Sequence, residues 1–403
     1  MPRARLFAVV CASLQRRPST DGRTAEFVAL TALLAGLVLV RVAVGYGAGT
    51  LRSATGLLRV PLVVTLAYSA VALAAIGAGY AALATVSEAH LDRDELAQAG
   101  LAATPLVVVA VYVALGRLNV GVSALPVVRS TGYLVAVGLL SGGYARAVDL
   151  DVPTLPPARD GWVVAGVGAA AVVASVALTT VGATLVGWPD APFAAFRYGT
   201  TPAVPSLLLT TVVPVTVTAA GTALLFNGAV QTALARHRSP AATVGAVTLL
   251  AFGVDWAITA VPVALSPILG PVPAPVRWLV ALAGVVAAVV VALAAALAFG
   301  SLWDELAVLS GHGRSTLAAA AGAALGAVVA VGGFTLVGAG FGPAAVSYAV
   351  AVGTAAVTFE RTETVWAPAV VYAAHGVAIR LAPYYVVPDG AGDVALTVLP
   401  TLT

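Results

Sequence analysis

Long apolar stretches that follow one another along almost the whole chain are the feature that most limits which folds it can adopt. Most of them are roughly 17–25 residues long, the length that an α-helix needs to cross the hydrocarbon core of a bilayer. They lie near residues 26–46, 60–85, 100–117, 124–146, 161–187, 203–234, 241–267, 276–302, 315–338, 342–358 and 365–385. Because backbone polar groups must be satisfied internally in lipid, we expect an all-α polytopic membrane helix bundle with about ten or eleven transmembrane helices.

The amounts of apolar and charged residues agree with that expectation. Of the 403 residues, 60% are apolar and 9% are charged, whereas about 25% are charged in a typical soluble domain. The net charge is only +3, and no basic run with interleaved aromatic residues indicates a nucleic-acid interface. The single cysteine, Cys11, excludes an internal disulfide and a cysteine-based metal site. The lipid bilayer is the expected partner, and nucleic acid is not.

The distribution of arginine gives part of an orientation. The residues that precede the first apolar stretch include Arg3, Arg5, Arg16, Arg17 and Arg23. By the positive-inside rule they predict a multi-pass protein of the cell membrane with a cytoplasmic N-terminus. The basic turn at 236–238 is also expected on the cytoplasmic side. The loops at 46–59 and 88–100 favour the opposite assignment, so the full topology stays open.

Polar breaks between the apolar stretches suggest how the chain is organised. The Pro-rich segment "DLDVPTLPPARDG" (149–161) is the clearest internal boundary. It separates N-terminal transmembrane helices in 1–148, which match no family that we recognise, from a second membrane domain in 149–403.

Three stretches on the C-terminal side of this boundary carry a family resemblance. They read "TALLFNGAVQTALARHRSPAATVGAVTLLAFGVDW" (222–256), "FERTETVWAPAVVYAAHGVAIRL" (359–381) and, more weakly, "VDLDVPTLPPARDGWVVAGVG" (148–168). Together they resemble the CAAX-processing and bacteriocin-processing membrane proteases, also called the CPBP or Abi family. The resemblance covers about residues 160–385 and implies that the helices near 203–234, 241–267 and 365–385 pack around one polar pocket.

The chain departs from the family pattern where the resemblance would place catalytic groups on the first motif helix. The family's chemistry needs a Glu pair and an Arg there. Thr222 and Ala223 occupy the positions of the two glutamates, and Asn227 occupies that of the arginine.

The two other motif helices depart in the same way. Trp256 follows Phe252 at the position of the first histidine, with Asp255 just before it. Tyr372 takes the position of the second histidine, and His375 follows three residues later. A carboxylate and a histidine are needed to activate water or to hold a metal that does so. Since neither aligned histidine is present, and no aligned glutamate, the resemblance implies a protein without the family's peptidase activity.

The polar residues of the motif helices form one candidate pocket: Asn227, Gln231, Asp255, Trp256, Tyr372 and His375. Asn227 and Gln231 are four apart and share one helix face. They either line a substrate cavity or hydrogen-bond to neighbouring helices. A carboxylate inside a membrane helix needs a partner, so Asp255 is expected to face inward and to hydrogen-bond with Asn227, Tyr372 or His375.

Two further charged stretches are interpreted as solvated turns. Glu305 and His312 in "WDELAVLSGHG" (303–313) are seven apart, which is a weak Glu/His pair. The stretch "FERTETVW" (359–366) contains Glu360, Arg361 and Glu363 and is read as a charged turn into the last helix.

Three functions remain open at this point. The first is an inactive CPBP-like protein that binds a membrane peptide or a partner protein and needs no cofactor. The second is an active intramembrane protease that uses relocated groups such as Asp255, His375 and Glu305, with zinc as its cofactor. The third is a transporter or permease with Asp255 as an ion or proton site, although no paired inverted repeat supports it.

Overall fold

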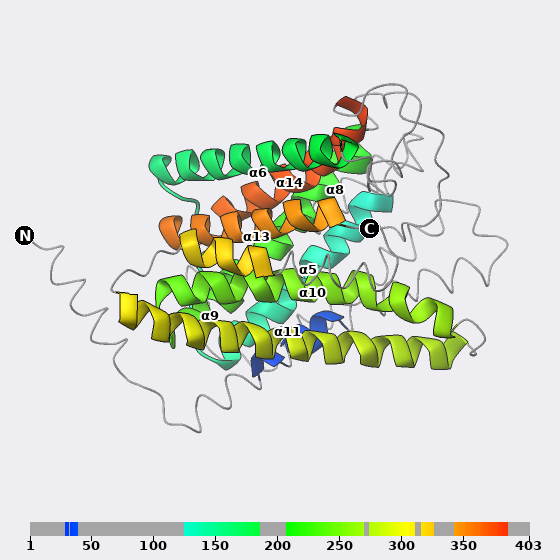
Figure 1. Ribbon diagram of the computed structural model, residues 1–403, viewed down its shortest axis with the longest axis horizontal. Coiled ribbons are helices and arrows are strands. Elements are labelled where there is room, and N and C mark those ends of the chain that lie inside the picture. Colours follow the sequence, from blue (N-terminus) through cyan, green and yellow to red (C-terminus); the bar gives the residue numbers. More distant parts are fainter. Residues whose placement is uncertain are drawn as a thin grey trace, which may run out of the picture.

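The fold is known from a computed structural model (Figure 1), in which every regular element that the structure describes is a helix. The structure describes residues 29–31, 33–38, 125–185, 207–269, 274–310, 316–325 and 342–385. The main elements are α5 (Leu125–Ala147), α6 (Arg159–Leu185), η2 (Leu208–Val212), α8 (Val213–Thr222), η3 (Ala223–Gln231), α9 (Thr232–Ala235), α10 (Pro240–Leu269), α11 (Ala274–Ser310), α13 (Gly342–Thr362) and α14 (Trp366–Tyr385).

The all-helical expectation is confirmed for the described part of the chain. Within it, four helices are long and apolar enough to cross a membrane: Arg159–Gly182, Thr210–Ala235, Pro240–Thr259 and Leu279–Glu305. The apolar stretches expected near 60–85 and 100–117 lie outside the described residues, as do the N-terminal arginines and the loops at 46–59 and 88–100.

The helices differ in how deeply they are buried. α10 runs through the middle of the bundle and packs against α11, α13 and η3. α6 and α11 lie along opposite sides (Figure 1). Both present large apolar side chains on their outer surfaces, including Val163, Val167 and Leu178 on α6 and Leu279 and Val291 on α11. A helix that is apolar on its exposed face is what a lipid environment requires.

Two glycines allow α10 and α11 to approach closely. A Cβ atom built on Gly253 would lie 2.7 Å from the Cβ of Ala292, and one on Gly245 would collide with the ring of Phe299. The two pairs run in opposite directions along the two helices, so α10 and α11 form a tightly packed antiparallel hairpin. Small residues at such crossings give membrane helices their closest packing.

Several helices begin or end at one end of the bundle, which lies to the left in Figure 1. We call it the polar end, and it comprises the segments 148–158, 236–239 and 363–365 with the residues of α11 that contact them. Local signals set these turns. Asp149 and Glu363 both have a φ of 49°, the left-handed conformation that commonly terminates helices.

The starts of α10 and α14 at the polar end are capped by hydroxyl side chains. Ser239 Oγ accepts a hydrogen bond from the backbone N–H of Ala242 at 3.3 Å, and Pro240 follows as the first residue of α10. Thr364 Oγ1 accepts from the backbone N–H of Trp366 at 3.4 Å. Serine and threonine satisfy free N–H groups at such positions, and proline suits the first helical residue.

Two expectations about charged turns hold only in part, because the helices extend further into these stretches than expected. Residues 303–310 form the last two turns of α11, which continues to Ser310, while His312 lies outside the described residues. Glu360 and Arg361 belong to the last turn of α13, and only Glu363 lies in the turn itself. In both places helical hydrogen bonding continues through acidic residues, although acids are unfavourable near a helix C-terminus. Arg361 in the last turn of α13 has the charge that favours such an end.

Candidate functional site

The central element of the candidate site is η3, a nine-residue π-helix at Ala223–Gln231. It continues from α8 and contacts α5, α10, α13 and α14, so it lies at the centre of the described helices. A second π-helical segment, Leu208–Val212, lies earlier in the same continuous helix. π-Helical turns widen the backbone and are frequent at functional sites. The segment coincides with the motif in which the family resemblance places catalytic groups.

Asn227 and Gln231 face the interior from this segment. Their exposed fractions are 0% and 3%. The Asn227 Nδ2 group donates to Gln231 Oε1 at 2.8 Å, and Gln231 Nε2 donates to the backbone carbonyl of Ala356 on α13 at 2.9 Å. The shared face inferred from their spacing is confirmed. Asn227 Oδ1 is buried and has no hydrogen-bond partner among the described residues.

A second polar group surrounds Tyr372 of α14. Its hydroxyl is buried without a hydrogen-bond partner in the described part of the chain. Tyr133 of α5 and Asp255 of α10 lie close enough to interact with it electrostatically. The Tyr133 hydroxyl in turn lies 3.4 Å from Thr222 Oγ1, at the end of α8. Four helices therefore contribute hydroxyl or carboxyl groups to this region.

A third polar contact joins α13 to α14. The hydroxyl of Ser347 lies 3.2 Å from His375 Nε2, and both side chains are buried. The ring of Tyr348 packs against the imidazole with a centroid separation of 5.6 Å. It also lies 6.2 Å from the ring of Phe252 on α10. Trp256 packs in the same aromatic cluster.

The six candidate residues thus fall into three local groups. The Tyr372 hydroxyl has no hydrogen-bond partner among the described residues, so of the three partners expected for Asp255 it is not the one that forms a hydrogen bond. Asp255 is half-buried and is linked to Tyr372 by electrostatic interaction. A hydrogen bond from Asp255 to Asn227 or His375 stays a prediction. His375 meets Ser347, because α13 packs against α14 as well as α10.

The sequence motifs missed Ser347, Tyr133 and Thr222 as partners of the candidate residues. Thr222 was noted only as a replaced glutamate position. Ser347 lies outside every motif, and the only signal that could have suggested it is the short connection between α13 and α14, which makes these helices neighbours. Glu305, a relocated group in the protease alternative, is exposed on α11 at the polar end. In the described ranges, no group of three or more His, Cys, Asp or Glu side chains is arranged to hold a metal ion.

The segment 148–158, which we call the strap, closes the polar end above η3. Arg236 donates from Nη1 to the carbonyl of Val148 at 2.8 Å and from Nη2 to that of Asp149. Further along, the three consecutive carbonyls of residues 153–155 accept hydrogen bonds from the turn between α13 and α14. The strap is therefore held between the turn at 236–239 and the turn at 363–365.

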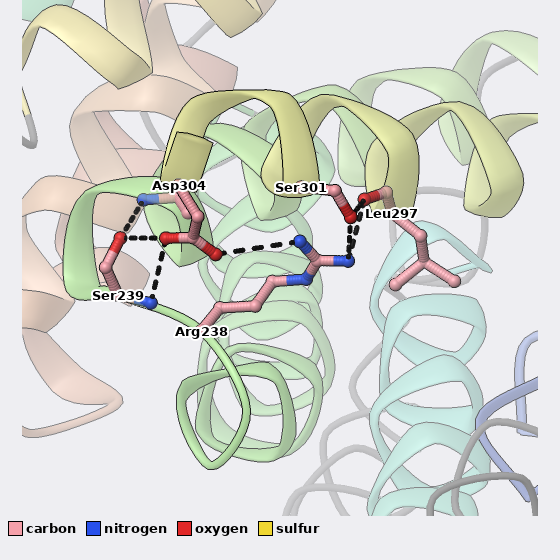
Figure 2. Close-up of polar contacts among 6 residues, drawn as sticks. Arg238, Ser239, Leu297, Ser301 and Asp304 are labelled. Atoms are coloured by element: carbon pink, nitrogen blue, oxygen red, sulfur yellow. Dashed lines mark hydrogen bonds and ion pairs between the residues drawn. The ribbon is translucent and has the colours of Figure 1, made fainter. Parts of the chain in front are cut away.

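A neighbouring cluster ties the start of α10 to the end of α11 (Figure 2). Arg238 Nη2 donates to the carbonyl of Leu297 at 2.7 Å and to Ser301 Oγ at 3.1 Å, and Nη1 lies 3.8 Å from Asp304 Oδ2. Asp304 Oδ1 also accepts from the backbone N–H and the hydroxyl of Ser239. Desolvation lowers the pKa of Arg238 from its usual value, and the nearby Asp304 carboxylate partly offsets this.

Comparison of the chain with protein-family models, curated proteins and solved structures finds no match. The CPBP resemblance therefore rests on the sequence motifs alone.

Proposed function

We propose that this chain is an integral membrane protein of the CPBP-like type that binds a membrane peptide or partner protein at η3 and does not hydrolyse it. The four apolar helices support a place in the cell membrane. Three motif stretches support the family. The absence of both aligned histidines and both aligned glutamates from the motifs supports the lack of hydrolysis.

The observation that carries the binding proposal is the buried carbonyl oxygen of Asn227. A buried polar atom without a hydrogen bond costs about 1–3 kcal/mol. Asn227 lowers the stability of the apolar bundle by this amount unless a ligand supplies the missing hydrogen bond. The free atom is an acceptor, and the natural complement to an acceptor is an N–H group. A peptide backbone or a side-chain amide supplies one, so a peptide ligand fits this atom better than a purely apolar lipid tail.

Binding and cleavage can be tested together with purified protein in nanodiscs. We would titrate it with a fluorescent prenylated peptide and with a fluorescent single-span peptide, and follow both anisotropy and cleavage products. We expect saturable binding of at least one peptide and no products from either. Asn227→Leu should weaken that binding by about tenfold, because one hydrogen bond in a dry site is lost.

The matched control is Val291→Leu, which changes an exposed side chain on the outer face of α11. It should bind peptide like the unchanged protein. Equal binding by the Asn227→Leu variant would show that the peptide does not reach η3, and absence of binding to either peptide would remove the proposal's support. Chelator-sensitive cleavage, or one zinc per chain by elemental analysis, would establish the protease alternative.

The contact between Ser347 and His375 favours one second candidate, a hydrolase with relocated groups. A serine hydroxyl and an imidazole nitrogen at 3.2 Å lie at the outer limit of the distance at which histidine can activate a nucleophile. An active serine nucleophile would be labelled by a fluorophosphonate probe, and Ser347→Ala would abolish the labelling. Because Ser347 is 0% exposed, we expect no labelling, with the pair acting as a hydrogen bond between helices.

A further inference from the structure

We propose that the strap is a releasable cover packed on the polar end of η3, and that it must lift before a peptide can reach Asn227 from that end. This inference rests on the proposed function, since it names how access to the same site is regulated. It depends on the contacts at the start and middle of the strap and on the position of the strap above η3.

The start of the strap is held by the buried side chain of Leu150, by a backbone hydrogen bond from Leu150 to the carbonyl of Ala145 on α5, and by one basic side chain. Arg236, in the turn after α9, binds the carbonyls of Val148 and Asp149. These carbonyls follow the C-terminus of α5, where helical carbonyls lack partners within the helix and a basic side chain can bind them. Since Arg236 is exposed, this attachment can be lost without opening the bundle.

The middle of the strap is held by the turn before α14. The backbone N–H of Val365 donates to the carbonyl of Pro153 at 3.1 Å. The indole N–H of Trp366 donates to that of Thr154 at 2.8 Å, and the hydroxyl of Thr364 donates to that of Leu155 at 2.6 Å. Three donors from residues 364–366 thus bind three successive carbonyls of the strap. Because all three acceptors are backbone atoms, the same donors could bind the backbone of another extended peptide.

The strap lies directly against η3. A Cβ atom built on Gly228 would lie 2.9 Å from Val152 Cγ1 and 2.9 Å from Val365 Cγ1. Gly228 is the residue after Asn227, so Val152 of the strap and Val365 of the turn cover the face of η3 next to the face that carries the Asn227 side chain. Together these two side chains close this part of η3 at the polar end.

The apolar contacts of the strap are concentrated at its start. Leu150 is buried in the hydrophobic core, and Val148 and Val152 pack against that core. Beyond Val152 little apolar surface is buried: Leu155 is 69% exposed, Pro156 is exposed, and residues 153 and 154 are only partly buried. Segments with few buried apolar contacts and with backbone hydrogen bonds near solvent open at low free energy. The part of the strap after Leu150 can therefore move while Leu150 and the helices stay packed.

Cysteine reactivity measures this opening without any ligand. In a Cys11→Ser background, Val365→Cys reports exposure beneath the strap and Asn227→Cys reports exposure of the site. An opener, Arg236→Ala with Trp366→Phe, removes the bonds to the carbonyls of residues 148, 149 and 154. We expect a membrane-impermeant maleimide to label both reporters about tenfold faster in the opener, because several hydrogen bonds no longer favour the closed state.

The matched control is Arg361→Ala with Trp162→Phe, which makes the same changes at exposed side chains and should leave both rates unchanged. Trp366→Phe alone serves as a milder opener if the double change prevents folding, with a rise of about threefold. The proposal fails if the Val365→Cys reporter labels no faster in the opener, or if that reporter responds and the Asn227→Cys reporter does not. Peptide binding could persist in either case, so failure of this inference and failure of the proposed function are distinguishable.

Discussion

The polar end and the interior of the bundle differ in how completely their polar groups are hydrogen-bonded. At the polar end, Arg236, Arg238 and Trp366 each donate to groups on another segment. In the interior, Asn227 Oδ1 and the Tyr372 hydroxyl are buried with no hydrogen-bond partner among the described residues. The two regions adjoin at Gly228, where the strap packs on η3.

This difference shows which region supplies stability and which is available for binding. Satisfied hydrogen bonds fix the turns relative to one another, so changes there should lower the free energy of unfolding. An interior polar group without a hydrogen bond does not stabilise the fold, so a substitution that removes it should not lower the free energy of unfolding. The four predictions below test this contrast, in order of decreasing effect.

The largest effect is expected at the junction of the two regions. Gly228→Leu places a side chain where Val152 and Val365 already lie 2.9 Å from the added Cβ position. Overpacking of this kind destabilises by about 3 kcal/mol, measured by denaturant unfolding in detergent. Gly166→Leu on α6, where an added Cβ meets nothing within 4 Å, should change stability by less than about 1 kcal/mol. Equal effects of the two changes would contradict the described packing.

The next effect belongs to the polar end. Arg238→Ala removes donors to Leu297 and Ser301 and leaves Asp304 without its cation. Because the Arg238 side chain is only 12% exposed, we expect a loss of about 2 kcal/mol in the free energy of unfolding. Arg361→Ala, at an exposed position of the same end, should cost less than about 0.5 kcal/mol. A double-mutant cycle with Asp304→Ala should show favourable coupling, and zero coupling would contradict the ion pair.

A smaller effect is expected at Asp255, on the border of the interior. Asp255→Ala removes a half-buried carboxylate from the middle of α10, together with its contacts there, and should cost about 1 kcal/mol. The comparison is Val291→Ala, at a position 67% exposed on the outer face of α11, where little change is expected. If thermal unfolding in detergent gives the same midpoint for both variants, Asp255 has no structural role.

The smallest loss is expected at Tyr372. Tyr372→Phe removes a buried hydroxyl that lacks a hydrogen bond, so stability should not fall and should rise by about 1 kcal/mol. Thr364→Val, which removes a hydroxyl bonded to the strap at 2.6 Å, should cost about 1 kcal/mol. Both variants are compared by denaturant unfolding in detergent. A larger loss in the free energy of unfolding for Tyr372→Phe than for Thr364→Val would contradict the proposed difference between the two regions.

The helices themselves could be predicted well from the sequence. The apolar stretches near 124–146, 161–187, 241–267 and 365–385 correspond to α5, α6, α10 and α14 to within a few residues. This agreement has a simple cause, since a long apolar segment must satisfy its own backbone and forms a helix wherever it is placed in lipid. Helix ends were predicted less well where charged residues continue a helix, as at residues 303–310.

The candidate site was only partly predictable. The spacing of Asn227 and Gln231 was sufficient to place them on one face, because this depends on one helix alone. The partner of His375 depends on which helices are neighbours, and nothing in the motifs showed that α13 packs against both α10 and α14. The π-helical form of η3 has no sequence signal that we recognise, since it is decided by packing around the segment.

The length of α11 has a consequence for how this helix would sit in a bilayer. Its 37 residues, Ala274–Ser310, make it ~55 Å long, against a hydrocarbon thickness of about 30 Å. Ser301 and Asp304 bond to the turn before α10, so the last turns of α11 belong outside the hydrocarbon region. The apolar part between Leu279 and Ser301 is roughly 33 Å long, which nearly matches that thickness. Because α11 is packed tightly on α10, a bilayer much thinner or thicker than this should tilt the two helices together.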